Sequence, residues 1–249
     1  MVAALAESFR RDGYVVVPAA VDPVAVGEIS AAMAALQRQL VAGSLDRRRY
    51  GGDVYTAAAR GSAATHPHYI LDVARLSPEV DAVFHDPDLV SLVEACLGVA
   101  PWEFGPEHGR EFGVVFQDAR PGDGTAYTRI GWHTDRQAYP TSDFHPSVAV
   151  TVHLDATSPA NGFLRVLPGS HLGGTDGMPP GFEGVRGEVA LYCEAGDVLV
   201  HHCDLWHAAA RATEDPPGGV RRHLRGSWFG GRRPAVGEPI EAFNKNAAR

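Results

Sequence analysis

The chain has 249 residues, a formal net charge of −8, 45% hydrophobic residues and 21% charged residues. This length and apolar fraction can supply the core of one domain, so we expect residues 1–249 to form a single unit. The acidic balance argues against binding to a nucleic-acid backbone, and no apolar run approaches the ~18 residues of a membrane helix. We therefore expect neither nucleic acid nor membrane as a partner.

The N-terminus and the cysteines indicate the compartment. Charged residues occur too early for a secretory signal, and no cleavage region follows. Cys96, Cys193 and Cys203 lie far apart with no C-x-x-C pair, which fits a reducing cytoplasm and argues against a disulfide framework or a cysteine zinc site. We expect a cytoplasmic protein, and composition does not determine its oligomeric state.

The first 105 residues are predicted to be mainly helical. In residues 21–43, Asp22 is a plausible N-cap before Pro23, and the helix should end at Gly43. Its buried face should carry apolar residues at spacings of three or four: Val26, Ile29, Met33, Leu36 and Leu40. Residues 85–98 repeat the pattern, with His85 or Asp86 as N-cap, Pro87 and a stop at Gly98. Its apolar positions are Leu89, Leu92, Val93 and Leu97.

From residue 106 to 232 the pattern changes to short strands. Six runs rich in Val, Leu and aromatics are separated by Gly, Pro, Asp and Asn: "EFGVVFQD", "SVAVTVHLD", "GFLRVLPGS", "GEVALYCEAG", "GDVLVHH" and "VRRHLRGSWF". Many short strands with such turns favour an antiparallel sandwich or jelly roll. We expect a mainly β core with flanking α-helices that cover one sheet, followed by a tail at 233–249.

Two stretches, 44–68 and 118–146, lack clear periodicity. They are either surface loops or a substrate lid over the mouth of a jelly roll, and the pattern does not separate the two. Their candidate lining residues are Tyr50, Tyr55, Arg129, Trp132 and Tyr139. Aromatic side chains with a few polar groups suit a ring-bearing small molecule better than a bare acyl chain.

The most specific chemical signal is "WHTD", which places His133 and Asp135 two positions apart. On an extended segment these side chains can turn to the same side. A third ligand could come from His201, His202 or His207, in and after a strand of another part of the core. Two histidines and one carboxylate form the facial triad of non-haem Fe(II) oxygenases, which leaves positions open for other ligands.

Five segments in chain order resemble the phytanoyl-CoA dioxygenase family of Fe(II)/2-oxoglutarate-dependent oxygenases. They are "FRRDGYVVVPAAVDP", "WHTD", "NGFLRVLPGSH", "GDVLVHHCDLWH" and "RRHLRGSW". The resemblance covers about residues 8 to 230. It implies a double-stranded β-helix, which is a cupin-like jelly roll, and Fe(II), 2-oxoglutarate and dioxygen as cofactor and co-substrates.

The resemblance also implies individual roles. His133, Asp135 and His207 would be the iron ligands. Arg221 would bind the distal carboxylate of 2-oxoglutarate, with Arg222 as the alternative if the strand is one residue out of register. Thr151 falls where the family lines the co-substrate pocket, and a core threonine is the equal alternative. His202 matches a family histidine near the site, whereas His171 matches a position that is not a ligand.

The implied reaction is oxidation of an unactivated aliphatic C–H bond of a small-molecule metabolite. Hydroxylation, cyclisation, desaturation and epimerisation can follow from the same substrate radical. Since halogenating members of the family replace the carboxylate with a small residue, Asp135 argues against halogenation. Lys245 is the only lysine beside abundant arginine, which is typical of a GC-rich bacterial genome and favours natural-product tailoring, such as antibiotic biosynthesis. The alternatives are a zinc-dependent hydrolase and a non-catalytic jelly-roll binding protein.

Overall fold

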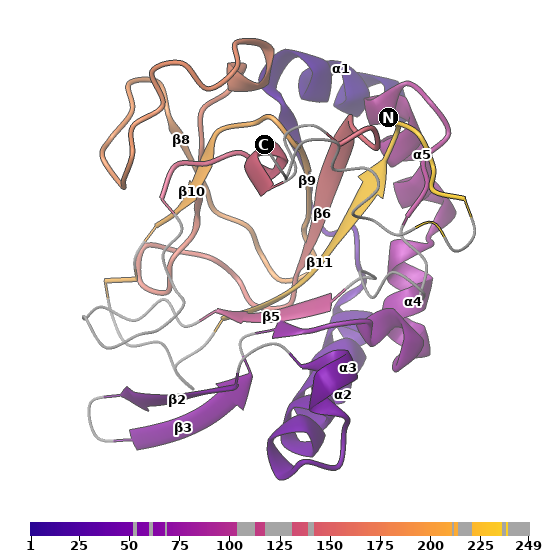
Figure 1. Cartoon of the computed structure of the whole chain (residues 1–249), viewed down its shortest axis with the longest axis vertical. Coiled ribbons are helices and arrows are strands. Elements are labelled where there is room, and N and C mark those ends of the chain that lie inside the picture. The colour runs from indigo at the N-terminus through magenta and orange to yellow at the C-terminus, as the bar shows by residue number, and fades with distance from the viewer. Residues whose placement is uncertain are drawn as a thin grey trace.

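A computed structural model describes residues 1–51, 54–59, 62–67, 69–103, 113–117, 131–138, 142–210, 212–213, 221–235 and 238, with the side chains of 54–59, 62–67, 116 and 117 left out. Two antiparallel sheets form the β core (Figure 1). The larger has the order β1-β9-β6-β11-β5-β4 and the smaller the order β10-β7-β8. The expected class, mainly antiparallel β with flanking helices, is confirmed.

The strands of the larger sheet are β1 (Tyr14–Val17), β4 (Tyr69–Ile70), β5 (Gly113–Gln117), β6 (Ser147–His153), β9 (Val198–His202) and β11 (Arg221–Phe229). Those of the smaller sheet are β7 (Leu164–Val166), β8 (Val189–Leu191) and β10 (His207–Ala209). All six strands expected from the sequence are present. Among the described residues, these two sheets contain three further strands. Strand β10 follows β9 in the chain. Strands β1 and β4 come from the N-terminal region that was expected to be mainly helical, because each pairs with a distant strand, β9 and β5.

The helices are α1 (Val2–Asp12), α2 (Pro23–Ala42), α3 (Arg47–Tyr50), α4 (Pro78–Phe84) and α5 (Pro87–Leu97), with 3-10 turns η1 (Val73–Arg75), η3 (Asp135–Ala138) and η4 (Ser170–Leu172). The side chain of Asp22 caps α2 by accepting from the amide of Val24, and Gly43 ends this helix at φ 77°, a left-handed conformation that glycine adopts without strain. The five predicted core residues of α2 are all buried. In α5 the cap is Asp86 rather than His85.

The stretch 44–68, expected to be irregular, contains α3 and a hairpin of β2 (Val54–Ala59) and β3 (Ser62–Pro67). The hairpin forms a separate two-stranded sheet (Figure 1). Small residues fill it, so no apolar periodicity marks it in the sequence. Residues 118–130 and 139–141 of the second irregular stretch lie outside the described residues.

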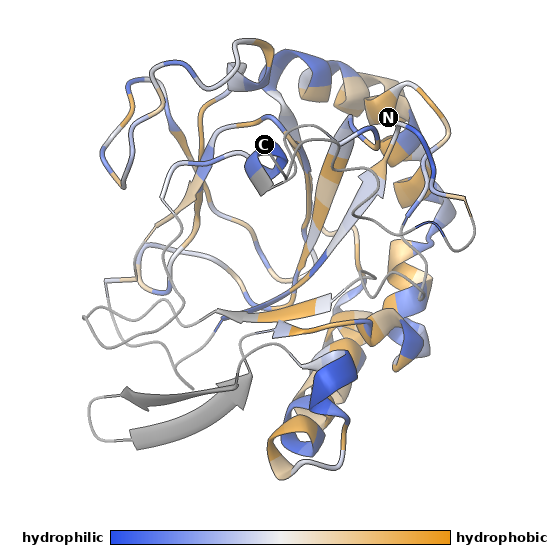
Figure 2. Cartoon of the chain, in the orientation of Figure 1, coloured by the Kyte–Doolittle hydropathy of each residue, from blue (hydrophilic) through white to orange (hydrophobic). Residues whose placement is uncertain are grey.

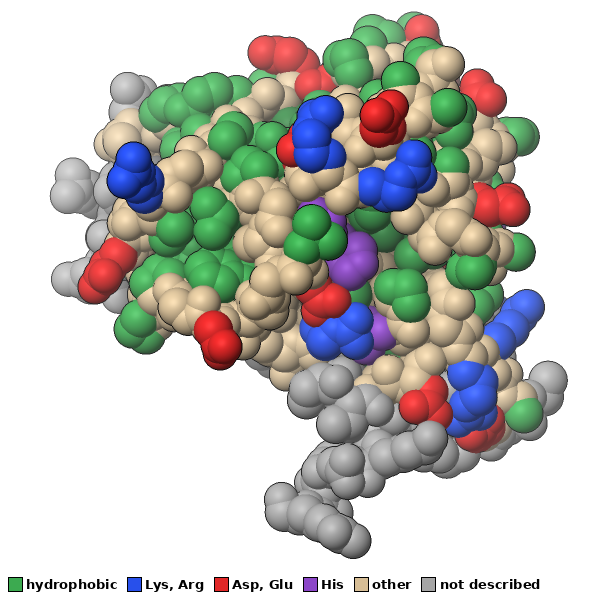
Figure 3. Space-filling model, turned by 90° about the horizontal axis from the view of Figure 1, so that it is seen from above, with side chains coloured by type: hydrophobic (Ala, Val, Ile, Leu, Met, Phe, Trp, Pro, Cys, Tyr) green, Lys and Arg blue, Asp and Glu red, His purple; other side chains and the backbone are tan. Residues whose placement is uncertain are grey.

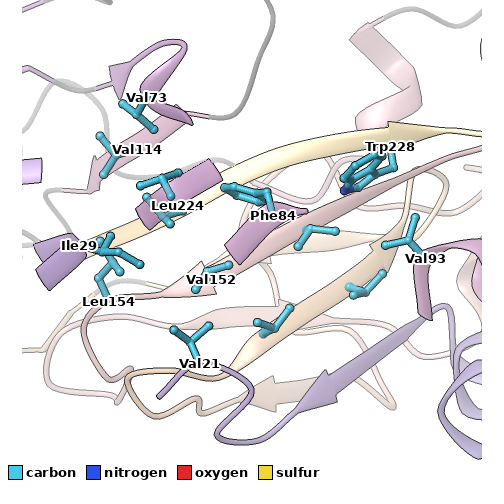
Figure 4. Close-up of a cluster of buried hydrophobic side chains, with 14 of the residues drawn as sticks. Val21, Ile29, Val73, Phe84, Val93, Val114, Val152, Leu154, Leu224 and Trp228 are labelled. Atoms are coloured by element: carbon cyan, nitrogen blue, oxygen red, sulfur yellow. The ribbon is translucent and has the colours of Figure 1, made fainter. Parts of the chain in front are cut away.

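The main core lies between the helices and one face of the larger sheet (Figure 4). Apolar residues line the helices and β6 in Figure 2. Along β6, Val148, Val150 and Val152 belong to this core, so by the alternation of a strand Thr151 and His153 point to the opposite face, toward the smaller sheet. This inner face is where the polar residues of the larger sheet gather.

No described helix is long and apolar enough to cross a membrane. Cys96, Cys193 and Cys203 are buried and free of disulfides, as expected from their spacing.

Candidate metal and co-substrate site

His133 and His207 are held side by side by their own backbones. Each amide donates to the other residue's carbonyl oxygen at 3.0 Å, which forms an isolated antiparallel bridge. The two imidazole rings lie 4.1 Å apart between centroids. Since His207 begins β10, the bridge places the "WHTD" segment against the smaller sheet.

The same local bond fixes both rings. Nδ1 of His133 lies 2.8 Å from the carbonyl oxygen of Gly131, and Nδ1 of His207 lies 3.0 Å from that of Leu205. A carbonyl oxygen only accepts, so Nδ1 carries the proton in each ring. The free lone pair is then on Nε2. This arrangement is typical of metal-binding histidines, whose other nitrogen donates to a carbonyl or carboxylate.

Asp135 completes the group at the start of η3. Its Oδ2 lies 3.0 Å from Nε2 of His201, and its Oδ1 accepts from Nη2 of Arg225 at 2.6 Å. Burial raises the pKa of Asp135, but the Arg225 guanidinium and the bond from His201 outweigh it and hold this pKa well below its usual range. The group is therefore a carboxylate at neutral pH.

The structure brings the three predicted ligands together: one ligand atom from each of His133, Asp135 and His207 lies within 4.8 Å of the other two. Burial lowers the pKa of His133 and lowers that of His207 to about 3, so both rings are neutral. Two neutral imidazoles and one carboxylate on one side of a partly buried site are the donor set that Fe(II) takes in the facial triad. The residues present fit this metal.

The two adjacent arginines point in opposite directions from β11. Arg221 is 5% exposed on the inner face, and burial lowers its pKa to about 10. Arg222 forms a two-bond pair with Asp155, at 2.9 Å from Nε and 2.7 Å from Nη2. The register thus places Arg221 on the inner face, whereas Arg222 lies on the opposite face and is paired with Asp155.

Thr151 is 8% exposed and lies on the inner face of β6, directly opposite Arg225 of β11. Its hydroxyl therefore faces the same interior as Arg221 and the metal-binding group. This position is compatible with the co-substrate role that the resemblance implies.

His201, and not His202, contacts the site. Because neighbours on a strand point to opposite faces, the ring of His202 lies against Phe9 and His171 on the far side of β9. Its Nδ1 accepts from the amide of Asp204. The expectation that His202 lies near the site is wrong.

A second group of potential metal ligands consists of His202, Cys203 and Asp204. These side chains already have other interactions or are protonated. Asp204 pairs with Arg136 through two nitrogens, and burial raises the pKa of the Cys203 thiol, which keeps it protonated.

Figure 3 shows histidine side chains in a hollow of the surface seen from above, bordered by arginine and acidic side chains.

Two of the aromatic residues proposed to line a lid are structural. Trp132 is 5% exposed, donates from its indole to the carbonyl of Glu183 and stacks under Arg165. Tyr50 packs against the main core. Trp132 is therefore buried by its neighbours, whereas Tyr50 is partly buried. Arg129, Tyr139 and the side chain of Tyr55 lie outside the described residues.

The sequence analysis did not single out the inner-face residues Arg225, His153 and His223. A signal existed for Arg225: it lies four positions after Arg221 on one strand, and an even separation means the same face. His153 is likewise two positions after Thr151.

Comparisons with known proteins show the family of the chain. The family model for phytanoyl-CoA dioxygenase (PhyH) matches residues 9–216. The iron/alpha-ketoglutarate-dependent dioxygenase ausU of Aspergillus calidoustus is 37% identical over 93 residues, which is 35% of this chain and 30% of that protein. The chain thus matches less than a third of the length of this relative.

Solved structures establish the fold. The non-haem alpha-ketoglutarate-dependent epimerase SnoN from nogalamycin biosynthesis has a TM-score of 0.63 at 23% identity, over 91% of this chain and 81% of that one. EctD from S. alaskensis with bound Fe has a TM-score of 0.68 at 18% identity, over 94% and 78%. The expected cupin-like jelly roll is confirmed. The chain belongs to the phytanoyl-CoA dioxygenase family, whose relatives here are iron and 2-oxoglutarate-dependent oxygenases.

Proposed function

We propose that this protein oxidises an unactivated aliphatic C–H bond of a small-molecule metabolite, with Fe(II) on His133, Asp135 and His207. The observation that carries the proposal is the convergence of these three ligand atoms next to an inner face that holds the buried Arg221. A buried guanidinium is a strong anchor for a carboxylate, because its fork matches the two oxygens.

The inner face of β11 carries two arginines that would lie near the two ends of the proposed co-substrate. Arg225 contacts the metal-ligand carboxylate of Asp135, and Arg221 lies four residues away on the same face, about 13 Å along the strand. Both arginine side chains reach into this space. A 2-oxo diacid that chelates the metal at one end would meet Arg221 at the other, with Thr151 alongside.

Fe(II) held by His133, Asp135 and His207 would, with 2-oxoglutarate and dioxygen, supply the oxidising chemistry, and succinate and carbon dioxide would be the co-products. The residues of the chain place and protect this chemistry. The bonds to Gly131 and Leu205 fix the two imidazole rings, while His201 and Arg225 hold both oxygens of Asp135. The apolar face behind β6 excludes water from the other side of the sheet.

The proposed substrate is a ring-bearing metabolite of natural-product tailoring, such as antibiotic biosynthesis, in the cytoplasm. SnoN was crystallised with Fe3+, alpha-ketoglutarate and nogalamycin RO, and EctD with 2-oxoglutarate and 5-hydroxyectoine, so similar folds accept small-molecule metabolites. Hydroxylation is the first expected outcome, and epimerisation or cyclisation are its close relatives. Asp135 fills the position that a halide would need, so halogenation is not proposed.

The test is a mass-spectrometric screen of candidate metabolites, scored by succinate formed from 2-oxoglutarate with Fe(II) and oxygen. We expect succinate to rise with one class of ring-bearing compound and oxidised product to appear in step. The same screen with Zn(II), scored for hydrolysis of esters and amides, is the control. Hydrolysis with zinc and no 2-oxoglutarate turnover with iron would identify a hydrolase and overturn the proposal.

A further inference from the structure

The feature that the proposed reaction has not used is the buried histidine at the end of β6. His153 is 5% exposed and lies on the inner face, two residues beyond Thr151. Its backbone is fixed on both sides, since its amide donates to Asp197 and its carbonyl accepts from Gly196. The position of the ring is therefore set by the sheet.

Neither ring nitrogen of His153 has a hydrogen-bond partner among the described residues. Leaving buried polar atoms without partners costs about 1–3 kcal/mol each, so native proteins rarely keep them without a use. By contrast, the rings of His133 and His207 are both held by carbonyl oxygens. The His153 ring therefore has two nitrogen atoms available for hydrogen bonds in the interior of the fold.

Arg221 lies near His153 on the inner face, and its positive charge indicates which kind of ligand the ring could bind. His153 pairs across the sheet with His223, and Arg221 is two residues before His223 on the same face of β11. The rings of His153 and His223 lie 6.2 Å apart between centroids. Burial and the nearby Arg221 charge lower the pKa of His153 to about 4, so the ring is neutral and donates one N–H.

We propose that His153 donates a hydrogen bond to the distal carboxylate of 2-oxoglutarate, beside the guanidinium of Arg221. This inference rests on the proposed co-substrate site at Arg221. Two donors from adjacent strands then converge on one carboxylate, which satisfies a buried histidine that has no hydrogen-bond partner in the part of the chain that the structure describes. The consequence is selectivity: a 2-oxo acid without the distal carboxylate leaves both donors facing an apolar chain end.

The experiment measures binding without turnover. Protein loaded with Mn(II) in the absence of oxygen is titrated calorimetrically with 2-oxoglutarate and with 2-oxovalerate, which has no distal carboxylate. His153→Phe keeps a ring of similar size and removes both nitrogens. We expect it to weaken 2-oxoglutarate binding by about tenfold to a hundredfold, the range of a charge-assisted bond. Binding of 2-oxovalerate and of Mn(II) should not change.

Two further variants sharpen the result. His153→Gln carries an amide donor near the position of Nε2 and should keep part of the affinity for 2-oxoglutarate. His202→Asn is the matched control. It changes a partly buried histidine of β9 that faces away from the site, and it should leave the affinity unchanged. In the absence of ligand, His153→Phe should melt at a temperature equal to or above that of the wild type, because it removes buried polar atoms without hydrogen-bond partners.

The outcomes separate the inference from the proposed function. If the wild type prefers 2-oxoglutarate and His153→Phe keeps that preference in full, the inference is overturned while the Arg221 site stands. If the wild type binds the two acids equally, the Arg221 site fails and the inference fails with it. Loss of preference in His153→Phe with retention in His202→Asn supports both.

Discussion

One oxygen atom of Asp135 lies near both Arg225 and the metal-binding residue His207. Nη2 of Arg225 donates to Oδ1 of Asp135 at 2.6 Å, and the same Oδ1 lies 3.8 Å from Nε2 of His207. The oxygen that faces the metal-binding histidine is thus held by a cation of β11, while Oδ2 is held by His201. Arg225 both keeps the carboxylate ionised and competes with a metal for it.

The first prediction follows from this competition. Arg225→Met should destabilise the metal-free protein by about 1 kcal/mol, because it leaves a partly buried carboxylate with one partner fewer. The variant should bind Mn(II) about tenfold more tightly, since a competing and repelling cation is gone while His201 still orients Asp135. Urea unfolding with and without Mn(II) measures both effects. Weaker Mn(II) binding in the variant would show that orientation by Arg225 outweighs its repulsion.

The second prediction concerns the ligand set. A metal that binds only the folded protein at about 100 times its dissociation constant adds about 2.7 kcal/mol of stability. His207→Ala should lose this gain and all iron-dependent succinate release, yet remain folded. His85→Ala changes a histidine of the α4 end that pairs with Glu103, and it should keep both properties. Near-normal succinate release by His207→Ala would refute the ligand assignment.

The third prediction compares the adjacent arginines. Arg221→Leu should raise the KM for 2-oxoglutarate by roughly tenfold or more, because a charge-assisted pair is lost. Arg222→Leu should change this KM little and instead lower stability, since it breaks the pair with Asp155. Steady-state kinetics and urea unfolding of both variants separate these effects. The reverse ranking of KM values would place Arg222 in the pocket.

The fourth prediction concerns acid. Burial lowers the pKa of His153 and of His202 to about 4 and that of His207 to about 3, whereas an unfolded histidine titrates near about 6.5. Below about pH 6.5 these histidines take up protons in the unfolded chain but not in the folded chain. Their contribution to the free energy of unfolding is therefore fully present above this pH and is lost as the pH decreases toward 3. We expect the metal-free protein to lose roughly 3 kcal/mol or more between pH 7.5 and 5.

Urea unfolding at a series of pH values checks this loss. His202→Asn retains an acceptor for the amide of Asp204 but does not titrate, so it should remove part of the slope. A free energy of unfolding that stays level from pH 7.5 to 5 would show that these histidines are protonated in the folded protein.

Much of the molecule is determined locally. Caps and periodicity in the sequence predict α2 from Pro23 to Gly43, and the six strand runs all form. Periodicity is a local property, because the burial of one face repeats every few residues along the chain. The resemblance in turn predicts the metal group, and the structure brings His133, Asp135 and His207 together.

Tertiary structure decides what depends on pairing between distant segments. Strand β1 pairs with β9, and His133 forms a bridge with His207. The local sequence of these segments does not predict which distant segment each will pair with. A shift of one residue reverses the face of a side chain, so only the register shows that His201 meets Asp135. The same register places His153 close to Arg221, since proximity across a sheet is a property of two strands and not of one.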